Sequence, residues 1–266
     1  MADNVSLKGR LALVTGSTTG IGRGIAHGLA KRGCSVILTG LIKEEEIPGL
    51  LSEFQSKYEG EFQFIPSDFL LGETTESFCK QVIAEYPGGV DILVNNAGLP
   101  GRGPIESLPF KVWNDTLAVN LTAPFLLTQT FFPLMKNKGW GRVINMASQM
   151  GLIGGDGKLA YCTTKAGLIG FSRVVALEGA QFGVTCNAIC PGFVDAPMCH
   201  SMVEKEAALK GISFEQSKLE FAEQRTPMAR LVTIDDLAEL AVFLCSEAAS
   251  CISGSPIPID SANMAR

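Results

Sequence analysis

The chain has 266 residues, of which 46% are hydrophobic and 18% charged, so it can bury the core of one large domain or two small ones. With 29 glycines and 13 prolines, its composition excludes the disordered and collagen-like classes. The formal net charge of −5 and the lack of a basic block argue against a nucleic acid partner, although local backbone amides can still bind a compact anionic cofactor.

Short apolar runs alternate with longer helical patterns along the whole chain. Each short run is bounded by Gly, Pro, Asn or Asp, as in strands that are covered on both faces. Strands separated by helices predict a doubly wound (Rossmann-type) parallel α/β sheet of about seven strands with helices on both faces. We find no linker, repeat or composition break, so we expect a single domain over 1–266. The predicted strands are 11–15, 35–39, 62–65, 91–95, 142–147, 184–189 and 256–259, and the predicted helices include 21–31, 74–86, 110–138 and 160–182.

A glycine-rich turn, TGSTTGIG (15–22), follows the first strand and opens the first helix. Gly16 permits a tight exit from the strand, while Gly20 and Gly22 remove side chains where the backbone approaches a pyrophosphate and the helix packs on the sheet. The free N–H groups and the dipole of the helix then face the anion. The turn predicts a dinucleotide site. An ordinary tight turn is the alternative, because the spacing differs from the commoner G-x-G-x-x-G.

The second strand does not end in the acidic residue that would bind a ribose hydroxyl pair. Its end reads LTGL (38–41), followed by Lys43 and an acidic run at 44–46. Lys43 is a candidate ligand for a 2′-phosphate, but an exposed lysine before an acidic run is more often only solvated. No basic residue stands directly before Gly20. We therefore expect NAD as the cofactor, with NADP as the alternative.

Three polar residues form a candidate catalytic group. Tyr161 and Lys165 are four residues apart on a predicted helix, so their side chains share one face. An ammonium beside a phenol lowers the phenol pKa toward the working pH, and such a tyrosine can protonate a ketone or take the proton of an alcohol. Ser148 follows the strand 142–147, and its hydroxyl can hydrogen-bond the same substrate oxygen.

The stretch 195–227 carries most of the late charge and is interrupted by Gly211. We interpret it as two amphipathic helices inserted after the sixth strand. An insertion at the carboxyl end of a strand lies over the ligand crevice of such a sheet, which predicts a helical lid. A solvated surface hairpin is the alternative.

The eight cysteines are scattered without a C-x-x-C pair, and only two histidines accompany them. This pattern predicts free thiols in a reducing compartment and no metal site. No run of 18 apolar residues occurs, so we expect no membrane span. The first ten residues, MADNVSLKGR, do not have the pattern of a secretory or transit signal, and we expect a cytoplasmic protein.

Together these motifs resemble the short-chain dehydrogenase/reductase family over essentially the whole chain. The resemblance implies a catalytic tetrad of Asn120, Ser148, Tyr161 and Lys165. In it Tyr161 is the general acid/base, Ser148 orients the substrate carbonyl, Lys165 binds the nicotinamide ribose and lowers the tyrosine pKa, and Asn120 holds a proton-relaying water. The matching segments are TGSTTGIG (15–22), Asp68 after the third strand, NNAG (95–98), Asn120 in VNLTAPF, Ser148, Tyr161-x-x-x-Lys165 and PG (191–192).

The same resemblance implies the remaining cofactor contacts. It places Asp68 on the adenine, Asn96 near the adenosine ribose, and residues 191–194 beside the nicotinamide amide. The implied cofactor-binding residues are Gly16, Thr18, Thr19, Gly20, Ile21, Gly22, Leu41, Asp68, Phe69, Asn96, Ala97, Gly98, Tyr161, Lys165, Pro191, Gly192 and Val194.

Within the family, the chain is similar to the D-3-hydroxybutyrate dehydrogenases. The similar segments are LTGL (38–41), NAICPGFV (187–194), VEKEAALKGISFEQ (203–216) and the final MAR (264–266). Those enzymes also lack the acidic residue after the second strand, yet they use NAD. Their substrate-carboxylate lysine matches Lys158, for which an ordinary surface lysine is the alternative.

Several substrate-binding groups of that subfamily are replaced in this chain. Pro100 and Met202 stand where it has glutamine, Met150 where it has histidine, and Phe193 and Asn263 where it has tryptophan. Only Lys158 remains as an evident partner for a carboxylate, so we expect an apolar pocket rich in Met and Phe. The predicted substrate contacts are Ser148, Met150, Lys158, Phe193 and Met202, with ordinary packing as the alternative for the two methionines.

We therefore expect an NAD(P)-dependent oxidoreductase that interconverts a secondary alcohol and a ketone, with a 3-hydroxybutyrate-like hydroxy acid as the best substrate. One alternative is a dehydrogenase for a larger or uncharged hydroxy compound. A non-catalytic nucleotide sensor is disfavoured because Tyr161 and Lys165 are both kept, and a serine hydrolase because no G-x-S-x-G occurs. The resemblance also implies a homotetramer built through 110–138, 160–182 and the C-terminal segment.

Overall fold

The computed structural model describes residues 5–265, and a parallel sheet with the strand order β3-β2-β1-β4-β5-β6-β7 lies at its centre. The strand order changes direction between β1 and β4, which makes their carboxyl ends the expected place for a ligand. The predicted fold class is confirmed. The strands are β1 Leu11–Thr15, β2 Ser35–Thr39, β3 Phe62–Phe64, β4 Ile92–Asn95, β5 Gly141–Met146, β6 Val184–Pro191 and β7 Pro256–Ile259.

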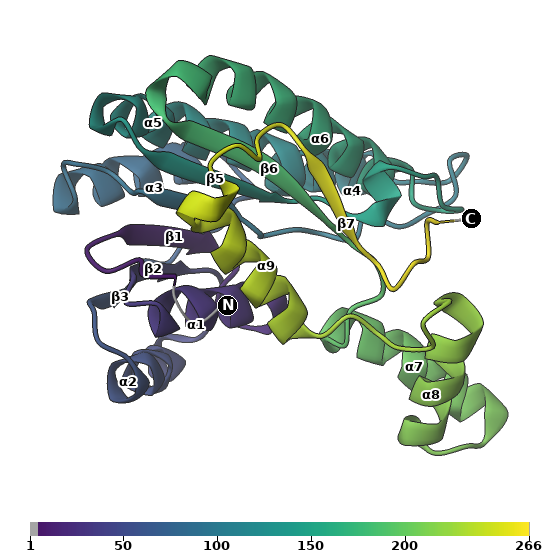
Figure 1. The fold of residues 1–266 in the computed structure, drawn as a ribbon. Coiled ribbons are helices and arrows are strands. Elements are labelled where there is room, and N and C mark those ends of the chain that lie inside the picture. The colour runs from purple at the N-terminus through teal and green to yellow at the C-terminus, as the bar shows by residue number, and fades with distance from the viewer. Residues whose placement is uncertain (1–4, 266) are drawn as a thin grey trace.

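Helices cover both faces of the sheet (Figure 1). On one face α1, α2 and α9 pack together, and on the other α3, α5 and α6. The helices are α1 Gly20–Lys31, α2 Ile47–Lys57, α3 Gly72–Glu85, α4 Phe110–Leu117, α5 Ala123–Lys138, α6 Leu159–Gly179, α7 Pro197–Lys210, α8 Phe214–Arg225 and α9 Ile234–Cys245.

Strand β1 shows why the strands are apolar along their whole length. Successive side chains of a strand point to opposite faces. Accordingly Ala12 and Val14 are buried in the core beneath α1 and α9, while Leu13 is buried in the core beneath α3 and α5. Both faces of β1 are buried, so polar and apolar residues do not alternate along this strand, as expected for a parallel sheet.

The segment 110–138, predicted as one helix, is continuous but not uniform. A π-helical turn, Ala118–Thr122, separates α4 from α5 and contains Asn120. Single π turns inside α-helices are often found at functional sites. By length and composition alone, Phe110–Lys138 could cross a membrane, and it is the only such helix in the part of the chain described. Its apolar character has a use in the fold, because Leu127, Phe131 and Met135 are buried in the core.

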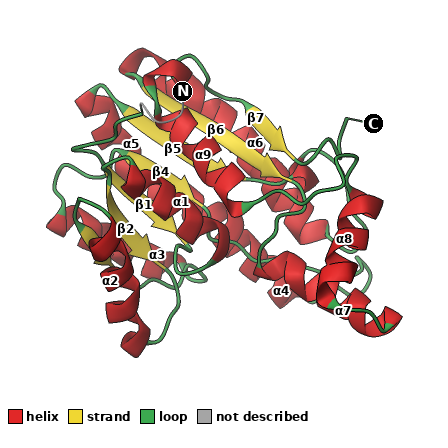
Figure 2. Ribbon diagram, turned by 60° about the horizontal axis from the view of Figure 1, so that its bottom comes forward, coloured by secondary structure: helices red, strands yellow, loops and turns green. Residues whose placement is uncertain are grey.

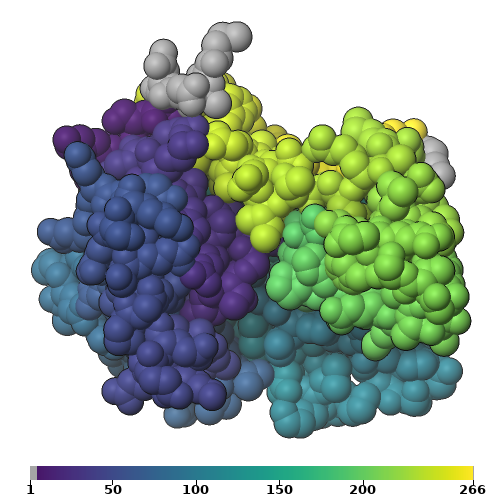
Figure 3. All heavy atoms as spheres, turned by 90° about the horizontal axis from the view of Figure 1, so that it is seen from below, coloured from purple at the N-terminus to yellow at the C-terminus, as the bar shows by residue number. Residues whose placement is uncertain are grey.

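Helices α7 and α8 occupy the stretch predicted as a lid, and Gly211 ends α7 in a left-handed conformation. Figure 2 shows both helices beyond the carboxyl ends of the strands, away from the helical layers that cover the sheet. In the space-filling view they form a separate block beside the N-terminal half, with a hollow between the two (Figure 3). Helices α7 and α8 therefore lie at the carboxyl edge of the sheet, where the sequence predicts a lid.

Candidate active site

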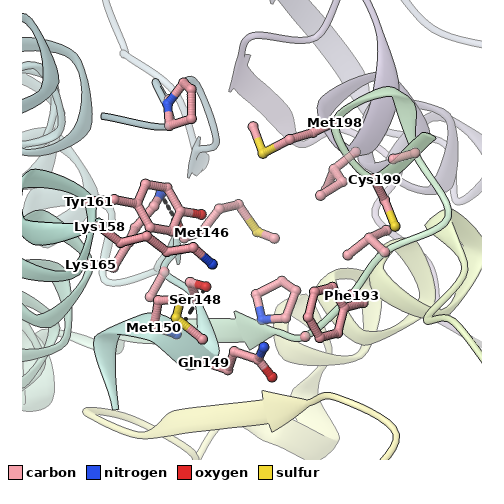
Figure 4. Close-up of a pocket in the computed structure, with 18 of the residues that line it drawn as sticks. Met146, Ser148, Gln149, Met150, Lys158, Tyr161, Lys165, Phe193, Met198 and Cys199 are labelled. Atoms are coloured by element: carbon pink, nitrogen blue, oxygen red, sulfur yellow. Dashed lines mark hydrogen bonds between the residues drawn. The ribbon is translucent and has the colours of Figure 1, made fainter. Parts of the chain in front are cut away.

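A cavity of about 190 Å³ lies at the carboxyl edge of the sheet and under the lid. The sheet side supplies the segments that follow β4, β5 and β6, and the lid side supplies α7 (Figure 4). The residues that line the cavity are Ile21, Asn96, Gly98, Pro100, Arg102, Met146, Ala147, Ser148, Gln149, Met150, Lys158, Tyr161, Lys165, Pro191, Gly192, Phe193, Val194, Ala196, Met198, Cys199 and Met202.

The glycine-rich turn has the close packing that its sequence predicts. Gly16 and Gly20 have φ values of +62° and +56°, a region that favours glycine. A Cβ on Gly22 would lie 2.3 Å from the Gly16 carbonyl oxygen, so only glycine lets α1 start this close to the turn. The N-cap residue Thr19 gives no side-chain hydrogen bond to the first turn of α1. The helix N-terminus is therefore available to a phosphate group.

The turn is held in place by two residues that follow or end strands. Thr15 Oγ1 accepts hydrogen bonds of 2.9 Å from the backbone N–H groups of Asn96 and Ala97. In return Asn96 Nδ2 donates to the carbonyl oxygens of Thr15, at 2.8 Å, and Gly16, at 3.2 Å. Asn96 thus fixes the turn through its amide as well as lining the cavity. Thr15 was missed by the sequence analysis, although its polar side chain at a strand end was a signal.

The adenosine side of the predicted cofactor site is formed by the ends of β2 and β3. Leu41 is 70% exposed beside Gly40, whose φ is +154°. A Cβ on Gly40 would meet Thr18 at 3.1 Å, so the turn and the end of β2 are in contact. Asp68 Oδ1 caps the Leu70 N–H at 3.0 Å.

Phe69, one of the predicted cofactor-binding residues, has its side chain in the core. It packs edge-to-face against Phe78 with 5.7 Å between the ring centroids. Only its backbone is left for the predicted cofactor contact. Apart from this side chain, the positive-φ glycines, the open helix N-terminus and the contact between Gly40 and Thr18 fit an extended dinucleotide.

Tyr161 and Ser148 face one another in the cavity. Tyr161 lies on the first turn of α6, and Ser148 caps the short helix Gln149–Gly151 by accepting the Met150 N–H at 3.1 Å. Burial raises the pKa of the Tyr161 phenol, and a hydrogen bond with Ser148 acts in the opposite direction. Figure 4 shows both side chains, together with Lys165 behind the tyrosine ring.

The position of Lys165 differs from the sequence expectation in one respect. Its Nζ lies 5.5 Å from the centroid of the Tyr161 ring and donates to the Met146 carbonyl oxygen at 2.6 Å. The ammonium therefore bonds the backbone rather than the phenol oxygen, and the pKa of Tyr161 stays raised by burial in place of the predicted lowering. Burial also lowers the pKa of Lys165 itself, to about 8.

Asn120 is fully buried behind the cavity wall. Its Oδ1 accepts the Leu99 N–H at 2.7 Å, and its Nδ2 donates to the Leu99 carbonyl at 3.0 Å and to Thr164 Oγ1 at 3.1 Å. The side chain therefore ties the segment after β4 to α6. Both N–H groups of the amide are therefore used, and the second lone pair of Oδ1 remains as an acceptor for the relay water predicted for Asn120.

Four of the predicted substrate contacts form the outer wall of the cavity. Met150 and Lys158 meet over Gly155, where a Cβ would lie 2.8 Å from the Met150 sulfur and 3.2 Å from Lys158 Cδ. Phe193 packs edge-to-face on Phe221 of α8 at 5.3 Å, and Met202 comes from α7. The structure therefore brings these residues together with Ser148, and the wall is apolar apart from its cations, as expected.

The expectation that Lys158 is the only cation at this wall is wrong. Arg102, in the segment after β4, also lines the cavity, and its Nη2 lies 3.5 Å from the Met202 sulfur. No periodicity or motif marks Arg102 in the sequence; only the fold brings it to Lys158. Gln149 was also missed: it is buried in the cavity floor, and its Oε1 accepts a hydrogen bond from Asn263 Nδ2 at 2.9 Å.

The lid is joined to the end of β6 by an ionic cluster. Asp195 accepts from His200 Nε2 and from Lys218 Nζ, both at 2.6 Å, and so links the start of α7 to α8. Burial raises the pKa of Asp195, but the bonds from Lys218 and His200 outweigh it, and the net pKa is lowered. Further ion pairs join Lys210 to Glu220 and Arg225 to Glu206. The two helices are thus expected to move as one unit.

Comparison with known proteins adds four similarities. A family model described as short chain dehydrogenase matches residues 10–207. A D-beta-hydroxybutyrate dehydrogenase of Cupriavidus necator is 42% identical over 94% of this chain and 95% of its own length. A 3-oxoacyl-(acyl-carrier-protein) reductase of Aquifex aeolicus is 37% identical over 96% of this chain and 98% of its own. Among solved structures, L-sorbose reductase of Gluconobacter frateurii, in complex with NADPH and L-sorbose, has a TM-score of 0.90 and 28% identity over 98% of both chains.

Proposed function

Because the chain belongs to the short-chain dehydrogenase family and is an NAD(P)-dependent oxidoreductase, we propose that it uses NAD to interconvert a small hydroxy acid and its oxo acid. The best candidate substrate is 3-hydroxybutyrate. One observation carries the proposal: Tyr161 and Ser148 share a small cavity with the cation Lys158. The 42% identity to a D-beta-hydroxybutyrate dehydrogenase supports the same substrate class.

Support for NAD over NADP comes from the end of β2. A 2′-phosphate needs a free cation there, and Lys43 is the candidate. Lys43 instead lies 4.0 Å from Glu45, with both side chains about three-quarters exposed. An acidic partner competes with a phosphate for this lysine. The exposed Leu41 offers an adenosine ribose apolar contact without charge.

The polar residues of the cavity have distinct roles in the proposed reaction. Tyr161 as phenolate takes the hydroxyl proton of the alcohol, and as phenol it returns that proton to the ketone oxygen. Ser148 hydrogen-bonds the same substrate oxygen. Lys165 holds the nicotinamide ribose, and Asn120 fixes the segment after β4 through its hydrogen bonds to Leu99. When bound, the nicotinamide supplies the two-electron chemistry by accepting the carbinol hydrogen as hydride or returning it. The raised pKa of Tyr161 favours the phenol, which donates to a ketone, over the phenolate that alcohol oxidation needs.

The lining of the cavity supports a substrate with one anionic end. The wall formed by Met150, Phe193 and Met202 suits the carbon chain, and Lys158 faces the cavity interior (Figure 4). A larger or uncharged hydroxy compound is the second candidate, favoured by the same methionines, because thioether side chains adapt to different shapes.

We also propose a homotetramer in the cytoplasm. Leu177, 79% exposed on α6, and Phe110, 76% exposed on α4, are large apolar side chains on the two helices implied to form the interfaces. All eight cysteines are free, and six of them are buried, which suits a reducing compartment.

The test of the proposed reaction is Tyr161→Phe, with Tyr58→Phe as the matched control. Removing the phenol oxygen should abolish NAD reduction with 3-hydroxybutyrate while NADH still binds, as measured by the fluorescence of the bound cofactor. Tyr58, at the end of α2 and outside the cavity, should tolerate the same change. Activity retained in Tyr161→Phe would overturn the assignment of the general acid/base.

A further inference from the structure

Two cations from distant parts of the sequence lie side by side at the outer wall of the cavity. Arg102 follows β4 and Lys158 precedes α6, and a parallel bridge pairs Gly103 with Lys158. The bridge is closed by the Gly103 N–H, which donates to the Gly157 carbonyl at 2.9 Å. The bridge thus holds the backbone beside Arg102 next to the backbone of Lys158, and both side chains line the cavity.

The backbone next to Arg102 also packs closely against α4. Gly101 has a φ of +45°, and a Cβ there would lie 2.5 Å from Thr116 Oγ1 of α4. The loop therefore lies directly on α4, with no side chain between them. Pro100 and Arg102 are the side chains that this loop contributes to the cavity wall, and Arg102 is the charged one of the two.

Neither cation has an acidic partner. Within residues 5–265, no carboxylate lies in ion-pair distance of Arg102 or Lys158. The protein contact of the Arg102 guanidinium is the Met202 sulfur, which is a weak acceptor. Burial, and then the charge of Arg102, lower the pKa of Lys158. Two like charges therefore lie at one partly apolar wall, and a bound anion would lower their mutual repulsion.

We propose that Arg102 is a specificity-determining residue whose guanidinium binds the substrate carboxylate together with the ammonium of Lys158. This inference rests on the proposed function and defines its substrate class as monoanionic hydroxy and oxo acids, with neutral alcohols as poor substrates. A guanidinium can hold both oxygens of a carboxylate at once, which an ammonium cannot. Charge thereby replaces the neutral amide and imidazole groups that are missing at Pro100, Met150 and Met202.

The contact between Arg102 and Met202 gives the carboxylate a second consequence. Met202 lies on α7, so the anion-binding pair lies at the junction of the loop and the lid. A carboxylate held there lies between two elements that otherwise touch through a weak contact. A carboxylate bound by Arg102 would therefore lie next to α7 of the lid.

The experiment compares Arg102→Met, Arg102→Lys and the control Lys80→Met with two probes of nearly equal shape, 3-hydroxybutyrate and its uncharged amide. Lys80 is an exposed cation of α3 outside the cavity, so its loss changes the net charge equally. In Arg102→Met the KM for 3-hydroxybutyrate should rise roughly tenfold or more, with little change in kcat or in NADH affinity. The KM for the amide should stay the same, and Arg102→Lys should recover part of the loss.

The outcomes separate the inference from the proposed function. If wild-type enzyme turns over 3-hydroxybutyrate and Arg102→Met raises the KM of acid and amide equally, the arginine acts through the loop or lid and the inference is wrong. An unchanged KM for the acid also overturns it. If wild-type enzyme prefers the amide or oxidises neither probe, the proposed hydroxy-acid function fails first.

Discussion

The buried ammonium of Lys165 lowers the stability of the folded protein. Its ammonium is buried, with one hydrogen bond of 2.6 Å to the Met146 carbonyl. Burial lowers the pKa of the amine from 10.5 to about 8, so near neutral pH the folded protein still holds a charge that water would solvate better. The charge that lowers the stability lies where it can bind the predicted cofactor ribose and act on Tyr161.

Lys165→Met should therefore make the unliganded protein more stable and inactive. The unfolded lysine binds its proton more tightly than the folded one, so wild-type stability rises as pH goes from about 8 to 10.5. At about pH 7 the variant should gain about 1–2 kcal/mol in the free energy of unfolding, after the lost Met146 hydrogen bond is deducted. The gain should vanish by about pH 10. Urea unfolding at both pH values measures it, and a variant less stable at both would contradict it.

At this scale the sequence could identify residues that belong to a local pattern. Tyr161 and Lys165 share one helix face. The glycines of the turn are recognisable because only glycine readily adopts the backbone conformations of so tight a turn. Arg102 belongs to no such pattern. It meets Lys158 only because the loop after β4 forms a bridge with the loop before α6, a tertiary contact between residues 55 or more positions apart. The pKa of Tyr161 was equally out of reach, because burial sets its direction.

At the level of the elements, the predicted cofactor site depends on the absence of a side chain at Gly22, where α1 packs against the glycine-rich turn. Gly22→Ala places a Cβ 2.3 Å from the Gly16 carbonyl oxygen, which must push the turn away from the helix. Affinity for NADH should fall roughly tenfold or more, measured by fluorescence titration. Gly49→Ala in α2 is the matched control, because nothing lies within 4 Å of its added Cβ. It should keep the affinity and gain about 0.5–1 kcal/mol in stability.

The lid gives the second prediction at this scale. Asp195→Asn replaces the carboxylate that bonds His200 and Lys218, so the lid should open more often. We expect faster tryptic cleavage within α7 and α8 and a KM raised roughly threefold to tenfold, with cofactor affinity unchanged. Glu223→Gln, an exposed residue of α8, is the control. Equal cleavage rates in all three proteins would show that Asp195 does not hold the lid.

The elements themselves were largely predictable because strands buried on both faces are continuous apolar runs. The exceptions have physical causes. The π turn at Ala118–Thr122 leaves the apolar pattern of 110–138 uninterrupted, so it cannot be seen in the sequence. Helix α2 begins at Ile47, has Pro48 and Gly49 in its first turn, and buries only Leu50 and Phe54, too few residues to give a clear helical period. Strand β6 runs two residues beyond its predicted end because Cys190 and Pro191 pair with β7.

On the scale of the whole molecule, substitutions of two exposed leucines can distinguish loss of the proposed tetramer from the general effect of a new surface charge. Leu177 of α6 is 79% exposed, and Leu209 of the lid is 87% exposed. If α6 forms an interface, Leu177→Asp should bury a charge there and break the tetramer into smaller species. Leu209→Asp should leave a particle with the mass of four 28.3 kDa chains. Sedimentation equilibrium of both variants measures this, and a monomeric wild-type protein would refute the tetramer.

The molecule as a whole is acidic, with a formal net charge of −5, yet its cavity wall carries unpaired cations. In the proposed reaction, local groups rather than the net charge attract the anionic cofactor and the substrate carboxylate: the N-terminus of α1, Lys165, and the pair Arg102 and Lys158. This local arrangement supports the proposed preference for a hydroxy acid over a neutral compound.

The most direct test of this account is the initial rate of NAD reduction by the wild-type enzyme with a series of hydroxy acids and their amides. The account predicts that a short hydroxy acid such as 3-hydroxybutyrate has the highest kcat/KM, that its amide is a much poorer substrate, and that NADP replaces NAD poorly. Equal or faster oxidation of the uncharged amides, or a preference for NADP, would contradict it.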